Sequence, residues 1–161
     1  MKGFTLIETL LYIALLGIII GGSIIASYSL MGVAARARTA SNIEDEGNFL
    51  MAKLDWALNQ TKSINQPGPN TSGQELYLIT LDDNRLIFSV DSGKKLNLQT
   101  NNSPALPLNN NETQITNVNF IRQTATGQTD SITINFSLKM LTQNGSPLTQ
   151  NFVMTSIINS Q

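Results

Sequence analysis

Glu8 is the residue whose position most needs a chemical explanation. It stands at the beginning of a segment in which the next 27 residues, up to Arg36, carry no formal charge. A carboxylate near lipid costs on the order of a few kcal/mol unless it is paired, neutralised or held at the interface. One interpretation is an interfacial Glu that interacts favourably with the positive end of a helix dipole. The other is a cationic partner for Glu8.

Few other residues in the chain are suited to catalysis or to metal binding. The sequence contains no His and no Cys, which removes the commonest general base, the commonest metal ligand and any thiolate nucleophile. Its neighbouring carboxylates, in Glu44-Asp45-Glu46 and Asp82-Asp83, together with Asp91, are typical of a solvated helix face and of turns. We therefore expect no catalytic residue, no metal and no cofactor, and a protein that is not an enzyme. A cation site at Glu44-Asp45-Glu46 and a calcium site at Asp82, Asp83 and Asp91 are the alternatives, although the sequence has no Asp-x-Asp-x-Asp-Gly loop.

Length and charge narrow the class of protein further. A chain of 161 residues holds one ordinary domain, and part of this one is too apolar to belong to a water-soluble core. The formal net charge of −1 provides no basic surface for phosphates. We therefore do not expect nucleic acid as a direct partner.

The uncharged segment between Glu8 and Arg36 is long enough to cross a bilayer. As a helix it would extend roughly 40 Å, since each residue adds about 1.5 Å. A cleavable signal peptide is an alternative, with small residues at Gly21-Gly22-Ser23 and Ala34-Ala35, but its basic region would be only Met1-Lys2. A plain single-pass anchor is a second alternative, and it gives Glu8 no role.

The residues around Glu8 form a specific pattern. The sequence Lys2-Gly3-Phe4-Thr5-Leu6-Ile7-Glu8 resembles the N-terminus of type IV pilins and type II secretion pseudopilins. In that family a short basic leader ends in Gly, the next residue is usually Phe, and a Glu follows four residues later, before a long apolar segment. Every one of these positions matches here. The rest of the chain agrees with the family in architecture only.

The resemblance implies how the N-terminus is processed and used. A prepilin peptidase would cut between Gly3 and Phe4 on the cytoplasmic side and methylate the new amine of Phe4. Gly3 suits this reaction because it has no Cβ to hinder a protease. Glu8 would then pair with the Phe4 amine of a neighbouring pilin or pseudopilin subunit during filament assembly on an inner-membrane platform.

The resemblance also implies a location. The precursor would cross the inner (cytoplasmic) membrane once, with its C-terminal domain outside the cytoplasm, and would then enter a periplasmic or extracellular filament. The flanking charges alone leave the orientation open, since Lys2 lies on one side of the apolar segment and Arg36 and Arg38 lie on the other. The motif favours a cytoplasmic N-terminus.

Three glycines lie within the apolar segment. Gly17 and Gly21 form a G-x-x-x-G, and Gly22 follows. Such spacing lets two membrane helices approach closely, so a simple membrane dimer is an alternative to a filament. Each glycine also weakens a helix by about 1 kcal/mol relative to Ala, and the resemblance implies local melting there when subunits leave the membrane.

The predicted helix continues as an amphipathic segment over residues 34–65. One of its faces carries small and apolar residues at alternating spacings of four and three: Ile43, Gly47, Leu50, Leu54, Ala57, Thr61 and Ile64. Trp56 could be an exposed anchor for a partner, but on such a helix a Trp more often packs against the domain, and this is the expectation here. The breaker sequence Gln66-Pro67-Gly68-Pro69-Asn70 is expected to end the helix.

After residue 70 the apolar period changes to two, which predicts antiparallel strands. Six are expected, at 76–81, 86–90, 95–99, 115–120, 132–138 and 152–158, with one face of the sheet packed on the amphipathic helix. Turns are expected at Asp82-Asp83-Asn84, Asp91-Ser92-Gly93 and Asn144-Gly145.

The predicted fold class is therefore α+β, with a long N-terminal helix packed on a small antiparallel β domain. Four parts are expected: a prepilin leader at 1–3, a transmembrane and filament-core helix at 4–33, an amphipathic continuation at 34–65 and a β domain at 66–161.

The functional prediction is a structural subunit, a minor pilin or pseudopilin, of a type IV pilus, a competence pilus or a type II secretion pseudopilus. A weaker resemblance to the J-type pseudopilins rests on the strands at 115–120, 132–140 and 152–158. The alternative is a single-pass, membrane-anchored β domain that binds a ligand and does not polymerise. Cleavage after Gly3 distinguishes the two, because an ordinary anchor does not need it.

Overall fold

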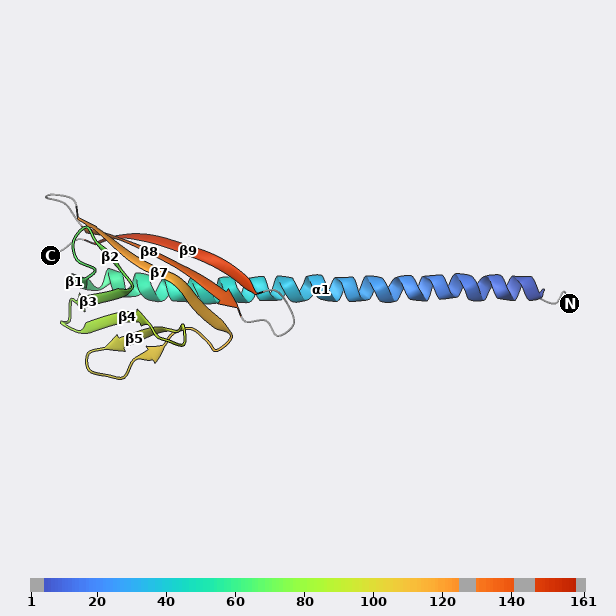
Figure 1. The fold of residues 1–161 in the computed structure, drawn as a ribbon, viewed down its shortest axis with the longest axis horizontal. Coiled ribbons are helices and arrows are strands. Elements are labelled where there is room, and N and C mark those ends of the chain that lie inside the picture. Colours follow the sequence, from blue (N-terminus) through green and yellow to red (C-terminus); the bar gives the residue numbers. More distant parts are fainter. Residues whose placement is uncertain (1–4, 125–129, 141–146, 159–161) are drawn as a thin grey trace. The chain divides into compact units, whose positions relative to one another are not determined.

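The computed structural model of the chain describes residues 5–124, 130–140 and 147–158. The chain divides into two compact units, Met1–Thr39 and Ala40–Gln161. Helix α1 (Leu6–Asn59) begins in the first unit and ends in the second, and the strands that follow it in the described residues are antiparallel (Figure 1). The predicted α+β class, one long N-terminal helix followed by antiparallel sheet, is confirmed.

In the first unit, α1 exposes its apolar side chains on every side. All the large hydrophobic residues from Leu6 to Val33 are exposed, and none of the most apolar 18-residue window is buried. A helix that is apolar all round and has no protein around it is suited to lipid or to other helices. By length and composition, this part of α1 is able to cross a membrane.

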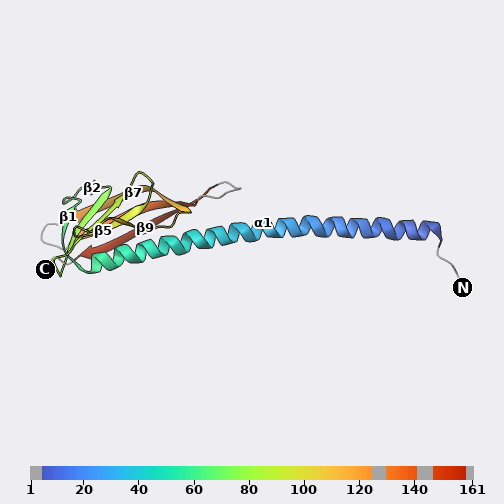
Figure 2. The ribbon, with the colours of Figure 1, turned by 90° about the horizontal axis from the view of Figure 1, so that it is seen from below.

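In the second unit, one face of α1 is buried against the strands. Its buried residues are Ile43, Gly47, Leu50, Leu54, Ala57 and Leu58, which confirms the predicted apolar face as far as Ala57. Figure 2 shows β9 running beside this half of the helix. Contact is closest at Gly47, where an added Cβ would lie 1.9 Å from Cζ of Phe152. The Phe152 ring in turn stacks on Phe136, with 5.2 Å between ring centroids.

The helix ends at Asn59, not near residue 65, and Thr61–Gln66 forms strand β1. The hydroxyl of Thr61 donates to the carbonyl of Ala57 (2.9 Å), and the chain then extends to pair with β3 (Glu75–Thr80). Thr61 and Ile64 are both buried although they are three residues apart, a spacing that in a regular strand places two residues on opposite faces. A register shift between Thr61 and Ser63 brings both residues to the core. Because a spacing of three is also typical of a helix, the sequence pattern predicted a helix here.

The strands form two sheets rather than one. The five-stranded sheet has the order β1-β3-β4-β5-β6 and the four-stranded sheet the order β2-β7-β8-β9. All six predicted strands are present, as β3, β4 (Arg85–Val90), β5 (Leu96–Thr100), β7 (Thr113–Thr124), β8 (Asp130–Met140) and β9 (Leu148–Ile158). The prediction missed β1, β2 (Ser72–Gly73) and β6 (Leu106–Pro107), of which the last two are only two residues long.

A largely buried ion pair lies within the four-stranded sheet, and its arginine also reaches the five-stranded sheet. Arg122 of β7 pairs with Asp130 of β8, and the two side chains are 13% and 11% exposed. The Arg122 guanidinium also donates to the carbonyl of Ile64 in β1 (2.8 Å), and the hydroxyl of Thr124 donates to Asp130 (2.6 Å). Burial by itself would raise the pKa of Asp130, but the Thr124 hydroxyl and the Arg122 charge hold that pKa below its ordinary value.

Two of the predicted turns are confirmed. Asp82-Asp83-Asn84 joins β3 to β4, with Asp83 in the left-handed region at a φ of 58°, and Asp91-Ser92-Gly93 lies between β4 and β5. The Asp91 carboxylate accepts from the backbone N–H of Lys95 (2.9 Å), and this bond, with one from the Asn97 side chain, lowers the pKa of Asp91. The predicted Asn144-Gly145 turn lies outside the described residues.

Two expectations for the second half of α1 are wrong. Trp56 does not pack into the domain: it is 43% exposed, with the ammonium of Lys53 4.7 Å from its ring centroid. In the run Glu44-Asp45-Glu46, the first two residues are exposed as expected. The Glu46 carboxylate instead accepts from the backbone N–H (2.7 Å) and the side-chain amide (2.9 Å) of Asn110. Glu46 therefore anchors the segment before β7.

Candidate processing and assembly site

Helical hydrogen bonding begins immediately after the expected cleavage point. The carbonyl of Thr5 accepts from the backbone N–H groups of Glu8 (3.1 Å) and Thr9 (3.2 Å), and the Thr9 hydroxyl donates to the carbonyl of Leu6 (2.9 Å). Gly3 and Phe4, the residues expected at the cleavage and methylation site, lie outside the described residues. A cut between them would leave a mature chain with its new amine close to the start of α1.

Glu8 lies in the first turn of α1 and is half-buried. A carboxylate at this position is stabilised by the positive end of the helix dipole, typically by about 0.3–1 kcal/mol. That interaction accounts for the presence of a Glu in the first turn.

The three predicted glycines face open space. Gly17, Gly21 and Gly22 are all helical, and a Cβ added to any of them would meet no atom within 4 Å apart from its neighbours and the nearby helix backbone. Among the residues that the structure describes, nothing packs closely against these three positions. The helix is unbroken at these positions in the isolated chain, and the expected local melting remains a prediction about the assembled state.

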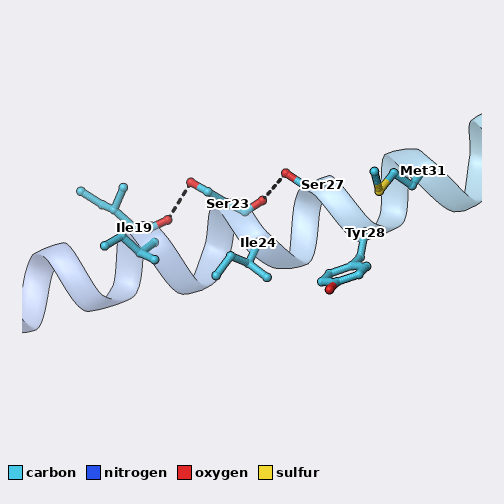
Figure 3. A pocket seen from close by; sticks show the side chains of 7 residues that line it. Ile19, Ser23, Ile24, Ser27, Tyr28 and Met31 are labelled. Carbon is cyan, nitrogen blue, oxygen red and sulfur yellow. Dashed lines mark hydrogen bonds between the residues drawn. The ribbon is translucent and has the colours of Figure 1, made fainter.

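A shallow apolar groove runs along α1 between residues 19 and 31, over the stretch that contains Gly21 and Gly22. It is lined by Ile19, Ile20, Ser23, Ile24, Ser27, Tyr28 and Met31 (Figure 3). The Ser23 and Ser27 hydroxyls donate to the carbonyls four residues earlier, each at 2.8 Å. Their polar groups are thus satisfied within the helix, which lets this surface meet lipid or another helix without an unpaired donor.

The carboxylates of Asp83 and Asp91, in the second unit, take part in structural contacts. In the described part of the chain, no three or more Asp or Glu residues are grouped so that they could hold a metal ion. Asp83, in the β3–β4 turn, forms an ion pair with Lys62 of β1 (2.7 Å), and Asp91 caps its own turn. These residues have structural partners.

The comparison with protein families concerns the N-terminus. Residues 1–24 match the family model described as the prokaryotic N-terminal methylation motif. The chain carries the class III signal peptide of type IV pilins. No match was found among curated proteins or among solved structures. The matched segment includes Gly3, Phe4 and Glu8 together with the three glycines.

The motif supports a type IV pilin-like or pseudopilin precursor. It accounts for a methylated N-terminus and a membrane anchor, and it indicates a structural rather than a catalytic protein. The apolar helix that follows is consistent with one crossing of the inner membrane. The motif also implies processing by a prepilin peptidase and assembly with other pilins.

Proposed function

We propose that this pilin-like chain is a structural subunit, a minor pilin or pseudopilin, of a type IV pilus, a competence pilus or a type II secretion pseudopilus. The observation that carries the proposal is the match of residues 1–24 to the methylation motif, which includes the start of a helix whose most apolar stretch is not buried. An apolar helix surface without a partner in its own subunit needs lipid before assembly and other subunits afterwards.

Glu8 would set the register between subunits. After cleavage between Gly3 and Phe4, the Phe4 amine of one subunit and the Glu8 carboxylate of the next are both costly in an apolar environment, and pairing removes most of that cost. A subunit out of register would leave one charge alone. The pair would therefore select the correct assembly more than it would stabilise it.

The other components follow from this role. A prepilin peptidase would cut and methylate the precursor, and an inner-membrane assembly platform would transfer the mature subunit from the bilayer to the filament. The second unit would then lie outside the cytoplasm, in a periplasmic or extracellular filament. The buried Arg122–Asp130 pair and the absence of Cys indicate a domain that depends on packing and polar contacts rather than on disulfides.

The mass of the N-terminal peptide tests the processing step. Membranes from cells that carry the matching peptidase should contain a mature chain that begins at methylated Phe4. Gly3→Val should remain uncut, because its branched side chain hinders the protease, while the matched Thr5→Ser variant should be processed normally. A wild-type chain that still begins at Met1 beside an active peptidase would instead indicate a membrane-anchored β domain that does not polymerise.

Glu8→Leu tests the assembly step. The variant should be inserted and processed like the wild type, but about tenfold less of it should enter sheared filaments, since its Phe4 amine would lack a partner. Glu44→Leu is a control for loss of an exposed carboxylate elsewhere on α1, and it should enter filaments normally. Equal recruitment of Glu8→Leu and the wild type would rule out the charge pair.

A further inference from the structure

Strand β9 forms one edge of the four-stranded sheet, and among the described residues no strand pairs with its outer side. Its pairing with β8 is regular over all 11 residues, from Leu148 to Ile158, without a register shift. This segment contains no charged residue, no Pro and no Gly. A regular edge strand of this kind offers a row of backbone N–H and C=O groups to a further strand.

The other three edges of the two sheets are protected against strand pairing. β1 is 6 residues long, includes Lys62 and has register shifts at two places, and β2 and β6 are only 2 residues long. On β7, which β2 covers in part, the backbone N–H of Ile115 donates to the carbonyl of Lys94 (2.8 Å). Further along β7, the backbone N–H of Arg122 donates to the carbonyl of Thr71 (2.9 Å). Charges, irregular pairing, short strands and covering loops are the usual protection of a sheet edge, whereas β9 is long, regular and uncharged.

The inward face of β9 lies at the rim of the core. Met154 and Ser156 are only half-buried, whereas the residues opposite them on β8, Ile134 and Ile132, are completely buried. Packing on α1 therefore covers inward side chains such as Phe152 and leaves β9 partly exposed on the side away from β8. A strand added on that side would extend the sheet without displacing a contact of the core.

We propose that β9 is a docking site for an extended segment of a different protein, which adds a further strand to the four-stranded sheet. Backbone hydrogen bonds along the edge would supply most of the affinity, and side chains on the outward face would select the partner. That face presents Val153 and Ile157, which are 65% and 70% exposed, and β9 offers no charge to pair with. The matching segment is therefore uncharged, with apolar residues four positions apart. The proposal does not require the chain to enter a filament.

A second copy of this chain fits the edge of β9 less well than a different protein does. Two identical edges pair about a twofold axis, which makes the two β9 strands antiparallel. β9 runs in the same direction as the second half of α1 (Figures 1 and 2), so the two helices would then run in opposite directions. Two copies anchored in one membrane with the same orientation need helices that run in the same direction. A contact between two different edges of the copies would have to use one of the protected edges.

Photo-crosslinking in the cells that make the protein identifies the partner. A photoreactive phenylalanine analogue at position 153 of the full-length chain should form about tenfold more linked product than the same analogue at position 106. Leu106 is the matched site, since it is 66% exposed and lies on the short edge strand β6. Sequencing of the linked peptide should return an uncharged segment of a different protein. A linked peptide from β9 of a second copy, or no more product than at Leu106, would overturn the proposal.

A synthetic peptide with the sequence of the linked segment tests whether the contact is a strand. When it binds to the purified full-length chain in detergent, about half of the backbone amides of β9, those that point away from β8, should change from fast to slow hydrogen exchange. Val153→Lys should weaken peptide binding about tenfold because it places a charge on the edge, while the matched Leu106→Lys should bind normally. Binding without slower exchange would show a contact of side chains only and would overturn the added strand. Equal binding by the two variants would also overturn it and would leave the filament function intact.

Discussion

The two halves of α1 differ in where their apolar residues find partners. From Leu6 to Val33 every large hydrophobic side chain is exposed, whereas from Ile43 to Leu58 one face is buried against the sheets and the opposite face, which includes Phe49 and Trp56, is exposed. A substitution in the first half should therefore affect insertion and assembly. A substitution on the buried face of the second half should affect the stability of the domain.

Leu54→Ala should have the largest effect on the second unit. Leu54 is completely buried, and removing three carbon atoms from a packed core costs about 3 kcal/mol, from lost burial and from the cavity that remains. Urea unfolding of the purified full-length chain in detergent, followed by Trp56 emission, measures this loss. Leu16→Ala is the matched control in the first half, and it should leave the unfolding free energy unchanged because Leu16 is exposed. If both variants lost the same unfolding free energy, the two halves of α1 would not differ in their contribution to the stability of the domain.

Asp130→Asn should have the next largest effect, and it should depend on pH. The substitution leaves the Arg122 guanidinium buried without its carboxylate, which we expect to cost about 3 kcal/mol at neutral pH. Because folding lowers the pKa of Asp130, the contribution of its charge is complete above the unfolded-state pKa of about 3.9 and is lost as the pH falls through the folded-state value. The variant should therefore lose less stability on acidification than the wild type.

Urea unfolding at neutral pH and across the acid range measures both parts of this prediction. Asp83→Asn is the control, since the Lys62–Asp83 pair is exposed and such pairs contribute little. An Asp130→Asn chain that matches the wild type in its acid sensitivity would show that other carboxylates, such as Asp91, dominate the acid unfolding.

The same contrast explains which features the sequence could predict. The first half of α1 was predictable because a helix that crosses a bilayer needs a long segment without charge. The motif was predictable because Gly3, Phe4 and Glu8 have fixed spacings. The six longer strands were predictable because each alternates with a period of two. These signals are local and need no knowledge of tertiary contacts.

The errors arose where tertiary contacts override the local pattern. Thr61 and Ile64 continue a helical spacing, yet the hydrogen bonds of β3 and a register shift make this segment a strand. The two-residue strands β2 and β6 are too short to show any period. Trp56 was expected in the core because aromatic residues usually pack there, although it lies off the face defined by Leu50 and Leu54. Only the packed structure shows that the domain leaves it exposed.

Gly47→Ala is the sharpest test of the contrast, although its effect should be smaller. In an isolated helix the change from Gly to Ala is favourable by about 1 kcal/mol. At Gly22, where the new Cβ would meet nothing within 4 Å, Gly22→Ala should leave the unfolding of the second unit unaffected. At Gly47 the new Cβ would lie 1.9 Å from the Phe152 ring, which is confined by its stack on Phe136. We expect this clash to outweigh the helix propensity and to cost about 1–2 kcal/mol.

The double variant Gly47→Ala with Phe152→Leu separates the clash from a general effect on the helix. Phe152→Leu alone should be destabilising because it removes the ring from the core, but it also removes the atoms nearest the new Cβ. The two changes should therefore cost less together than the sum of their separate costs, and a double-mutant cycle of urea unfolding measures the difference. Additive costs would mean that the ring moves aside freely. In that case Gly47 would be replaceable, and β9 would pack on α1 without requiring a residue that lacks a side chain.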